Sequence, residues 1–398
     1  MQKKRVAIIG TTGLPAKYGG FETLAHHLVD RLNNQYEITV YCSSKYFAEK
    51  HKRPSHFNGA KLVYLPFNAN GYQSIIYDIF SIFHALRNSD TLLLLGISGA
   101  LILPFVKLFS KKPVLVNIDG QEWKRPKWNW LAKKILGFSE RLAVKFADTV
   151  IADNRIIHEY VENAYGRSNA WLIEYGADHV SASPITEDAY QRYPFLSKPY
   201  AFNVCRIEPE NNVHLLLEAF SRCPDKTLVV VGLWNHGTYG MELRQFYSKF
   251  TNLHLLDPIY NQQELNILRS NAQVYVHGHS AGGTNPSLVE AMYLSLPVMA
   301  FDISYNRETT SHQAKFFRTS DDLIKLLRET TQEELMKMSY QLKTVANERY
   351  TWKRISDLYA AAIDQKDPVY TNLLTKQLAT QEEQIIRVNV ERSQPQTT

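Results

Sequence analysis

Short, unbroken apolar runs recur along this chain and constrain its fold more than any other feature. They lack the polar alternation of a half-exposed strand and are typical of parallel strands covered on both faces. Amphipathic segments of helical length separate them, for example 21–32, 75–86 and 128–146. Such alternation predicts a doubly wound α/β architecture. The runs are 6–9, 38–41, 91–95, 114–118 and 149–152, and then 200–205, 227–231, 253–255, 274–277 and 298–301.

A polar segment rich in Pro and Tyr, 181–199, interrupts this pattern. A single core rarely grows past about 250 to 300 residues, so a chain of 398 residues with 44% hydrophobic residues is expected to form two domains. We predict an N-terminal Rossmann-like domain at 1–180, a linker at 181–199 and a second Rossmann-like domain at 200–350. A closing helix at 351–365 and a polar tail at 366–398 complete the prediction.

The composition of the chain disfavours several classes of protein. The three cysteines, Cys42, Cys205 and Cys223, are too scattered for a disulfide framework or a zinc site and favour a reducing cytoplasm. The formal charge of +6 is too modest to favour a nucleic-acid partner. The most apolar stretch, 92–109, is interrupted by glycines, Pro104 and a lysine, so we interpret it as a buried strand followed by a helix.

A glycine-rich segment, GTTGLPAKYGGFET, follows the first apolar run and precedes a helix. Glycines tolerate the backbone angles of a turn that approaches a ligand at the carboxyl end of a sheet. The helix that starts near Phe21 would point its N-terminal amides towards an anionic group. The alternative is a plain loop between strand and helix. We predict a site here, with candidate residues Gly13, Tyr18, Gly19, Gly20, Phe21 and Glu22.

An NAD-dependent dehydrogenase or epimerase is the natural rival interpretation of this segment, because GTTGLPA resembles a dinucleotide-binding fingerprint. The loop is longer than that fingerprint allows. No acidic residue ends the next strand, where Tyr41 and Cys42 stand, so a ribose contact of the usual kind is missing. These features disfavour an oxidoreductase.

The segment NIDGQEWKRPKW, at 117–128, follows another apolar run. A carboxylate at the carboxyl end of a strand would face the same edge of the sheet as the glycine loop, where it could accept a proton or bind a sugar hydroxyl. Asp119 and Glu122 are the candidate catalytic residues. The structural alternative for Asp119 is a cap on the following turn.

Two segments of the second half carry the complementary chemistry. In RIEPENN, Arg206 ends a strand, and its planar fork of donors suits a diphosphate; a surface ion pair with Glu208 or Glu210 is the alternative. In HSAGGTNPSLVEAM, Asn285 is placed to cap a helix, with its first amides free to meet phosphate. Glu290, one turn further, would point towards a ribose, unless it is a solvated helix residue.

Together these four segments resemble glycosyltransferase family 4, over nearly the whole chain to about residue 363. The resemblance implies a GT-B fold: two Rossmann-like domains facing across a cleft, with C-terminal helices crossing back to the N-terminal domain. It further implies sugar transfer with retention, an acceptor in the N-terminal domain, and a sugar nucleotide held by Arg206 and Glu290. The chain departs from the family pattern at Asn211, where a Lys is usual, at Gly282, where a Glu is usual, and at Asp119, where a His is common.

These departures, with GTTGLPAKYGGFET and DGQEWKRPKW, resemble a narrower branch of bacterial β-1,4-rhamnosyltransferases that build capsule and cell-wall polysaccharides. The branch implies dTDP-L-rhamnose as donor, a saccharide or lipid-linked saccharide as acceptor, and neither cofactor nor metal. A UDP-hexose donor and a non-catalytic scaffold remain alternatives. The residues expected to bind the donor are Arg206, Asn211, Gly282, Gly283, Thr284, Asn285, Ser287 and Glu290.

Basic and aromatic side chains cluster at the start of the helix at 128–146. Positive charge beside interfacial aromatics is typical of a surface that rests on anionic lipid headgroups. The alternative is an ordinary helix start with its Trp residues packed inward. We expect a cytoplasmic protein with a peripheral contact to the membrane through Lys124, Arg125, Lys127, Trp128 and Trp130.

Overall fold

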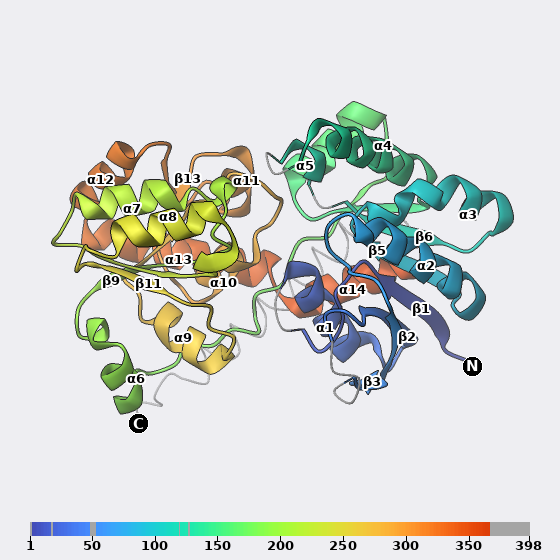
Figure 1. The fold of residues 1–398 in the computed structure, drawn as a ribbon, viewed down its shortest axis with the longest axis horizontal. Helices are drawn as coiled ribbons and strands as arrows, with labels where there is room; N and C mark the ends of the chain where they lie inside the picture. Colours follow the sequence, from blue (N-terminus) through green and yellow to red (C-terminus); the bar gives the residue numbers. More distant parts are fainter. Residues whose placement is uncertain (1, 17–18, 48–52, 119, 126–127, 367–398) are drawn as a thin grey trace, which may run out of the picture.

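The computed structural model describes residues 2–16, 19–47, 53–118, 120–125 and 128–366. Within these residues the chain forms two parallel-stranded sheets, each covered by helices (Figure 1). The predicted two-domain α/β architecture is confirmed. The tail after 366 and the predicted site residues Tyr18, Asp119 and Lys127 lie outside the described part of the chain.

The first sheet has the strand order β3-β4-β2-β1-β5-β6-β7-β8, and every pairing except β3 with β4 is parallel. Alternate side chains of its central strand enter different cores: Val6 and Ile8 face one core, and Ala7 and Ile9 face the other. The strands are β1 (Lys4–Ile9), β2 (Tyr36–Ser43), β3 (His56–Phe57), β4 (Ala60–Leu65), β5 (Thr91–Leu95), β6 (Val114–Asn117), β7 (Thr149–Ala152) and β8 (Trp171–Leu172).

Helix α1 (Gly20–Leu32) covers one face of this sheet, and the connections after β4 cover the other. Their buried residues separate accordingly: Leu24 and Leu28 of α1 belong to one core, whereas Tyr77, Leu103 and Ala143 belong to the other. The second set of connections comprises α2 (Gln73–Asn88), the 3-10 helix η2 (Ser98–Ile102), α3 (Leu103–Phe109), η3 (Glu122–Lys124), α4 (Trp130–Phe146) and α5 (Arg155–Tyr165).

The second sheet is wholly parallel, with the order β11-β10-β9-β12-β13-β14. Its strands are β9 (Tyr200–Val204), β10 (Thr227–Val231), β11 (Leu253–Leu256), β12 (Val274–His277), β13 (Val298–Phe301) and β14 (Lys315–Phe317). Its helices are η5 (Pro209–Asn211), α7 (Val213–Ser221), η6 (Trp234–His236), α8 (Thr238–Tyr247), α9 (Gln262–Ser270), α10 (Pro286–Tyr293), α11 (Ser304–Thr309), α12 (Ser320–Glu329) and α13 (Gln332–Arg349).

The strand orders locate the functional loops. In the first sheet, the strands that follow β1 in the chain are added on one side of it up to β4, and from β5 onwards on the other side. The second sheet has the same change of direction between β9 and β12. In open α/β sheets, ligands bind outside the carboxyl ends of strands at such switch points. The glycine loop follows β1, and the predicted donor loops follow β9 and β12. The topology therefore places the predicted motifs where a ligand is expected.

Helix α14 (Trp352–Ile363) leaves the second domain and packs beside α1 of the first, as the orange-red helix in Figure 1 shows. Asn117 at the end of β6 donates to the Tyr359 hydroxyl at 2.8 Å, and Tyr36 donates to the Ala360 carbonyl. The expected return of a C-terminal helix is confirmed. The segment 181–199 contains α6 (Glu187–Arg192) and η4 (Pro194–Ser197), and its Arg192 pairs with Glu264 of α9.

Candidate functional site

The glycine loop after β1 is fixed by hydrogen bonds from its own helix. Glu22, in the first turn of α1, accepts from the Thr12 amide at 2.7 Å and from the Thr12 hydroxyl at 2.9 Å. Gly19 precedes this helix with a φ of 117°, and a Cβ there would lie 2.0 Å from the Glu22 carboxylate. The Glu22 carboxylate therefore holds the loop through Thr12, and it occupies the space that a side chain at position 19 would need. Gly20 begins α1 close to Pro286 of the second domain.

The carboxyl ends of the two sheets meet at this edge. Thr284, after β12, donates to the Asp153 carbonyl after β7. Asn154 donates to the Thr309 hydroxyl at 3.2 Å, which ties β7 to α11. A Cβ on Gly283 would lie 1.9 Å from the Asp153 carboxylate. A side chain at position 283 would therefore displace either the Asp153 carboxylate or the loop of the second domain.

Gly282 and Gly120 extend this contact. A Cβ on Gly120, in the loop after β6, would lie 3.4 Å from the Gly282 carbonyl carbon and from the Gly283 amide nitrogen. Gly282 has a φ of 108°, a conformation that favours glycine. The glycine that stands where the resembled family has a Glu thus belongs to a backbone contact between the domains.

Arg206 lies just after β9 with an exposed side chain, and among the described residues its guanidinium makes no hydrogen bond or ion pair. Burial lowers the pKa of His279 most, and the His277 ring, stacked on it at 4.4 Å, adds to that shift. Arg206 and Arg125 lower the pKa of His279 further. The guanidinium groups of Arg206 in the second domain and Arg125 in the first therefore both lower the pKa of the His279 imidazole.

The His277 and His279 pair is held neutral inside the second domain. Burial lowers the pKa of His277 to about 3. Neither nitrogen of His277 nor Nδ1 of His279 has a hydrogen-bond partner among the described residues. A neutral imidazole leaves the positive charge of Arg206 uncompensated, which suits an anionic ligand, whereas Arg125 is paired with Glu122.

Asn211 shapes the loop that carries Arg206. It is buried, and its side chain donates to the Arg206 carbonyl at 2.6 Å. A Cβ on Gly278 would lie 2.2 Å from the Asn211 carbonyl, so the two loops are closely packed. Ser280 donates to the Glu210 carbonyl through both its amide and its hydroxyl. The amide of Asn211 thus orients the backbone of Arg206.

Helix α10 begins beside these loops with Asn285 at its N-cap and Pro286 in its first turn, as predicted. The Asn285 side chain does not cap the helix. Instead its Oδ1 accepts from Ser287 Oγ at 3.0 Å, and Ser287 Oγ accepts from the Tyr275 hydroxyl at 2.9 Å. Pro286 has no N–H, and the Leu288 amide donates to the Asn285 carbonyl at 3.1 Å, so in the first turn the Ser287 amide is the donor left for an anion.

Glu290 lies on α10 and is enclosed by two partners. Its Oε2 pairs with Arg269 of α9, whose side chain is 1% exposed, and its Oε1 lies 3.1 Å from His179 Nε2. Burial would raise the pKa of Glu290, but Arg269 and His179 outweigh it and lower the pKa to about 2. Glu290 is therefore an ionised, oriented carboxylate.

His179 connects Glu290 to the segment where the chain crosses between domains. Its Nδ1 accepts from Trp352 Nε1 at 3.0 Å, and the Trp352 amide donates to Asp178 at 2.6 Å. Trp352 also stacks on His27 of α1, with ring centroids 4.2 Å apart. A Cβ on Gly176 would lie 2.3 Å from the Trp352 ring. The second domain, the crossover segment and the first domain therefore pack together around Trp352.

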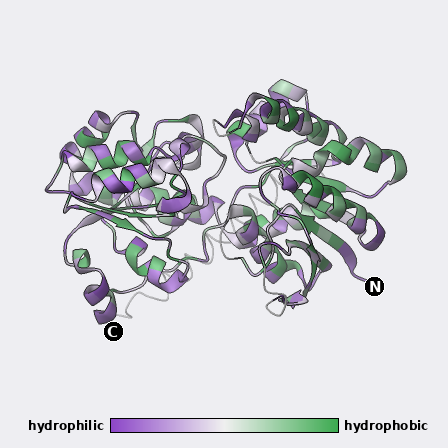
Figure 2. Ribbon diagram, in the orientation of Figure 1, coloured by the Kyte–Doolittle hydropathy of each residue, from purple (hydrophilic) through white to green (hydrophobic). Residues whose placement is uncertain are grey.

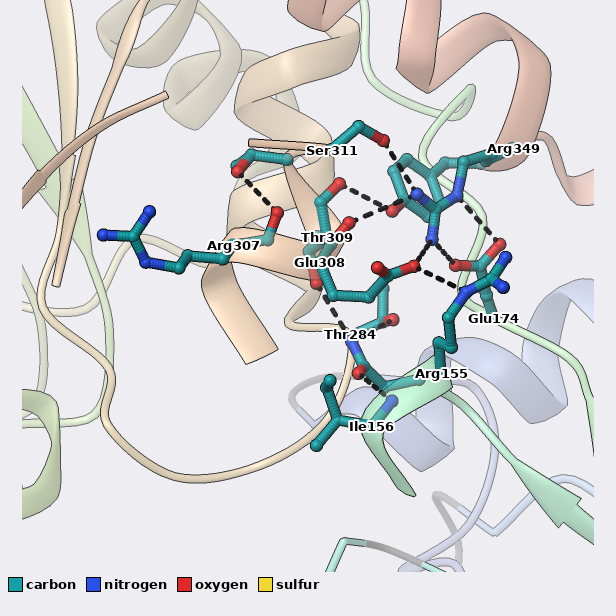
Figure 3. Close-up of polar contacts among 12 residues, drawn as sticks. Arg155, Ile156, Glu174, Thr284, Arg307, Glu308, Thr309, Ser311 and Arg349 are labelled. Carbon is teal, nitrogen blue, oxygen red and sulfur yellow. Dashed lines mark hydrogen bonds and ion pairs between the residues drawn. The ribbon is translucent and has the colours of Figure 1, made fainter. Parts of the chain in front are cut away.

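A second crossover contact is ionic (Figure 3). Arg349 pairs with Glu174 at 2.5 Å and with Glu308 of α11 at 2.9 Å, and Arg155 of α5 reaches the same Glu308 oxygen at 3.3 Å. Thr309 accepts from the Tyr350 hydroxyl through its carbonyl at 2.7 Å. The charges alternate in sign, so the network holds α5 against α11.

The first-domain loop at 120–129 contributes Glu122 and Arg125. Glu122 accepts from Trp128 Nε1 at 3.1 Å and lies 2.6 Å from Arg125 Nε. Arg125 is 9% exposed, so we leave it out of any lipid-facing surface. Lys124 lies over the rings of Trp123 and Tyr160, whereas Trp130 is 69% exposed.

Neither metal nor membrane span is evident in the described part of the chain. No group of three His, Cys, Asp or Glu side chains there is arranged to hold a metal ion. None of the described helices combines the length and the hydrophobicity that crossing a bilayer demands.

Comparison with known proteins agrees with this geometry. Residues 187–344 match the model of the family described as glycosyl transferases group 1, and residues 3–178 match a domain of unknown function, DUF1972. The chain has the GT-B fold, and part of its second half is similar to the group 1 glycosyltransferases. None of the curated proteins compared with the chain matches it.

Solved structures with the GT-B fold superimpose over most of the chain. Sucrose-phosphate synthase from Thermosynechococcus elongatus aligns with a TM-score of 0.77 at 15% identity, covering 91% of this chain and 99% of that one. Anabaena HepE in complex with UDP-glucose gives 0.70 at 15%, covering 92% and 100%. A glycosyltransferase from Rickettsia africae gives 0.68 at 12%, covering 92% and 99%.

Four residues of the candidate site carry no role predicted from the sequence. His277 and His279 flank a glycine directly after an apolar run, a pattern that could have drawn attention to them. Arg269 lies in the polar helix α9, and His179 lies at the edge of the predicted linker. Nothing in local spacing connects either residue with Glu290.

Proposed function

We propose that this protein transfers a sugar from a nucleotide sugar to a saccharide acceptor. The observation that carries the proposal is Arg206, an exposed guanidinium without a partner among the described residues, which together with Arg125 of the other domain lowers the pKa of the half-buried His279. A diphosphate fits this arrangement because a guanidinium donates in a planar fork. The start of α10 supplies a further donor, the Ser287 amide.

The donor we propose is dTDP-L-rhamnose, and the acceptor is a lipid-linked saccharide of surface polysaccharide synthesis. Both follow from the resemblance of GTTGLPAKYGGFET and DGQEWKRPKW to bacterial β-1,4-rhamnosyltransferases. Gly282, in place of the usual Glu, leaves sugar recognition to backbone amides and other side chains. A UDP-hexose is the second candidate, because HepE of similar fold was solved with UDP-glucose.

The proposed reaction follows from these positions. Arg206 and the Ser287 amide at the start of α10 stabilise the negative charge that develops on the leaving diphosphate. The acceptor hydroxyl forms the new bond at the anomeric carbon on the face from which the diphosphate departs, and the departing phosphate oxygen takes the hydroxyl proton. Glu122 or Asp119 orients the acceptor, and Glu290 binds the ribose. Contact between Thr284 and Asp153 holds the domains together and excludes water from the sugar.

A nucleotide panel tests the donor. A ligand that binds only the folded state raises the melting temperature, so dTDP, UDP and GDP are compared by thermal shift. We expect the largest shift with dTDP, and a loss of that shift in Arg206→Ala. A response to UDP alone would replace rhamnose with a UDP-hexose as donor.

Turnover separates the enzyme from a scaffold. Purified protein is incubated with dTDP-L-rhamnose or UDP-glucose and a lipid-linked saccharide, and the product is analysed by mass spectrometry and by NMR of the new anomeric centre. We expect rhamnose in the product with retained configuration. Donor turnover that survives both Arg206→Ala and Glu290→Gln unchanged would favour a non-catalytic role for this edge.

A further inference from the structure

Three neighbouring helices of the first domain expose a continuous set of large apolar side chains. On α2, Ile76, Phe80 and Phe83 are exposed, and their i, i+4, i+7 spacing places them on one face. On α4, Leu131, Ile135 and Phe138 repeat the same spacing. Figure 2 shows α2, α3 and much of α4 in green.

The short helix α3 lies between these two faces. Leu108 is 72% exposed and Phe109 is 83% exposed at its end, and Phe105 is exposed one turn earlier. Helix α3 packs against α4, and η2 contacts both α2 and α4, so the three outer faces adjoin. We call these residues the apolar face: Tyr72, Ile76, Phe80, Phe83, Phe105, Leu108, Phe109, Trp130, Leu131, Ile135 and Phe138.

The charged side chains of α2, α3 and α4 that are not buried all carry the same sign, and one of them, Lys107, pairs with Asp148 after α4. In α2, α3 and α4, all of whose residues are described, the only acidic side chains are Asp78 and Glu140, and both are buried. The same helices carry Arg87, Lys107, Lys133, Lys134, Arg141 and Lys145. Basic and apolar side chains on one surface match anionic headgroups above acyl chains, whereas most protein partners offer no such uniform negative charge.

The apolar face leads directly to the candidate site. At its edge, Asn129 donates to the Tyr72 hydroxyl at 3.4 Å, and the Tyr72 ring lies 6.2 Å from the Trp128 ring. Trp128 donates to Glu122, which pairs with Arg125. A molecule held at the apolar face therefore has its polar end near the loop that we propose orients the acceptor.

We infer that the apolar face is a membrane-docking surface that seats the first domain on an anionic lipid bilayer. Large exposed apolar patches on soluble domains mark interaction sites, and a face of this composition would lie in the plane of the bilayer surface. The benefit to catalysis rests on the proposed function, because the docked domain would meet a lipid-linked acceptor at Glu122. Binding to lipid itself is independent of any sugar chemistry.

Vesicle sedimentation tests the docking surface. The full chain is mixed with phosphatidylcholine vesicles, with and without phosphatidylglycerol, and the pelleted fraction is measured. We expect pelleting with the anionic vesicles, and loss of it at high salt. Each basic residue removed should weaken binding about fivefold, so Lys134→Ala, Arg141→Ala and Lys145→Ala together should cost roughly a hundredfold.

Two further variants separate contact through the apolar face from pelleting by aggregation or by another surface. Leu108→Ser with Phe109→Ser should abolish pelleting, while Met336→Ser with Tyr340→Ser, similarly exposed on α13, should pellet as the native chain does. Equal melting temperatures show that all variants fold. No pelleting of the native chain, or undiminished pelleting of both face variants, would overturn the inference. So would self-association in size-exclusion chromatography that the Leu108 and Phe109 changes remove.

Activity with two acceptors distinguishes this inference from the proposed function. The face variants should keep transfer to a water-soluble acceptor and lose transfer to the same saccharide embedded in vesicles. If no acceptor or donor is turned over but pelleting persists, the docking surface stands and the proposed reaction fails. If transfer to the soluble acceptor succeeds and the native chain does not pellet, the reaction stands and the docking surface fails.

Discussion

His179 Nε2 lies 3.1 Å from Glu290 Oε1, and this contact joins the segment that crosses between the domains to helix α10. Trp352 holds the other ring nitrogen of His179. The carboxylate proposed to bind ribose is therefore oriented by residues that also fix how the two domains meet. Donor binding and domain arrangement are expected to depend on each other.

Replacing Glu290 with Ala should destabilise the protein by about 3 to 5 kcal/mol, because Arg269 would keep a buried charge without its partner. Chemical denaturation measures the change. Adding Arg269→Met should restore most of the stability without restoring binding of dTDP. Glu329→Ala, which removes an exposed partner of Lys325, should change stability little. A mild effect of Glu290→Ala alone would mean that the Arg269 charge is solvated.

Replacing Arg206 with Ala should lower kcat by about a hundredfold to a thousandfold, because a preorganised donor to the leaving group is lost. Its exposed side chain has no partner in the described chain, so the melting temperature should not change. Steady-state kinetics with dTDP-L-rhamnose measures the effect, and Arg222→Ala on the same domain is the control. A rise in KM with unchanged kcat would assign Arg206 to ground-state binding only.

Gly283→Ala should separate the domains, because the new Cβ would lie 1.9 Å from the Asp153 carboxylate. Small-angle X-ray scattering should show a larger radius of gyration, and transfer activity should fall with it. Gly237→Ala, at a site with open space around the glycine, should change neither. If Gly283→Ala scatters as the native chain does, the loop after β12 yields locally and the contact does not hold the domains together.

Most strands of both sheets were predictable from sequence, including the edge strand β11, but β3, β4, β8 and β14 were not. Strands covered on both faces, such as β5 and β10, carry unbroken apolar runs that identify them. Of the missed strands, β4 is half exposed and includes Lys61 and Tyr64, and β8 and β14 are only two and three residues long. A short or half-covered strand leaves no such run.

The candidate site likewise contains residues that could be predicted from the sequence and residues that could not. Residues at strand ends and helix starts, such as Arg206 and Asn285, were predictable because glycine, proline and capping residues mark those positions. Their partners come from distant segments: Arg269 reaches Glu290 from α9, and His179 reaches it from the crossover. Such pairs are set by the packing of helices and not by spacing along the chain.

Asp78→Asn should stabilise the protein most at mildly alkaline pH. Burial raises the pKa of Asp78 from its ordinary 3.8 to about 8, although a hydrogen bond from the Gly99 backbone opposes the shift. The folded state therefore holds a proton that the unfolded state releases, and folding stability falls as the pH rises from about 4 to about 8. Asn cannot ionise, so Asp78→Asn avoids this loss of stability. In denaturation measured across this pH range, the stability gained by Asp78→Asn should be small near pH 4 and largest near pH 8.

Asp90→Asn is the control with the opposite pH dependence. Hydrogen bonds from Arg5 lower the pKa of Asp90 to about 2, so Asp90→Asn should destabilise the protein above pH 4 and lose its effect as the pH falls. A gain for Asp78→Asn that does not vary with pH would show that Asp78 is ionised in the fold.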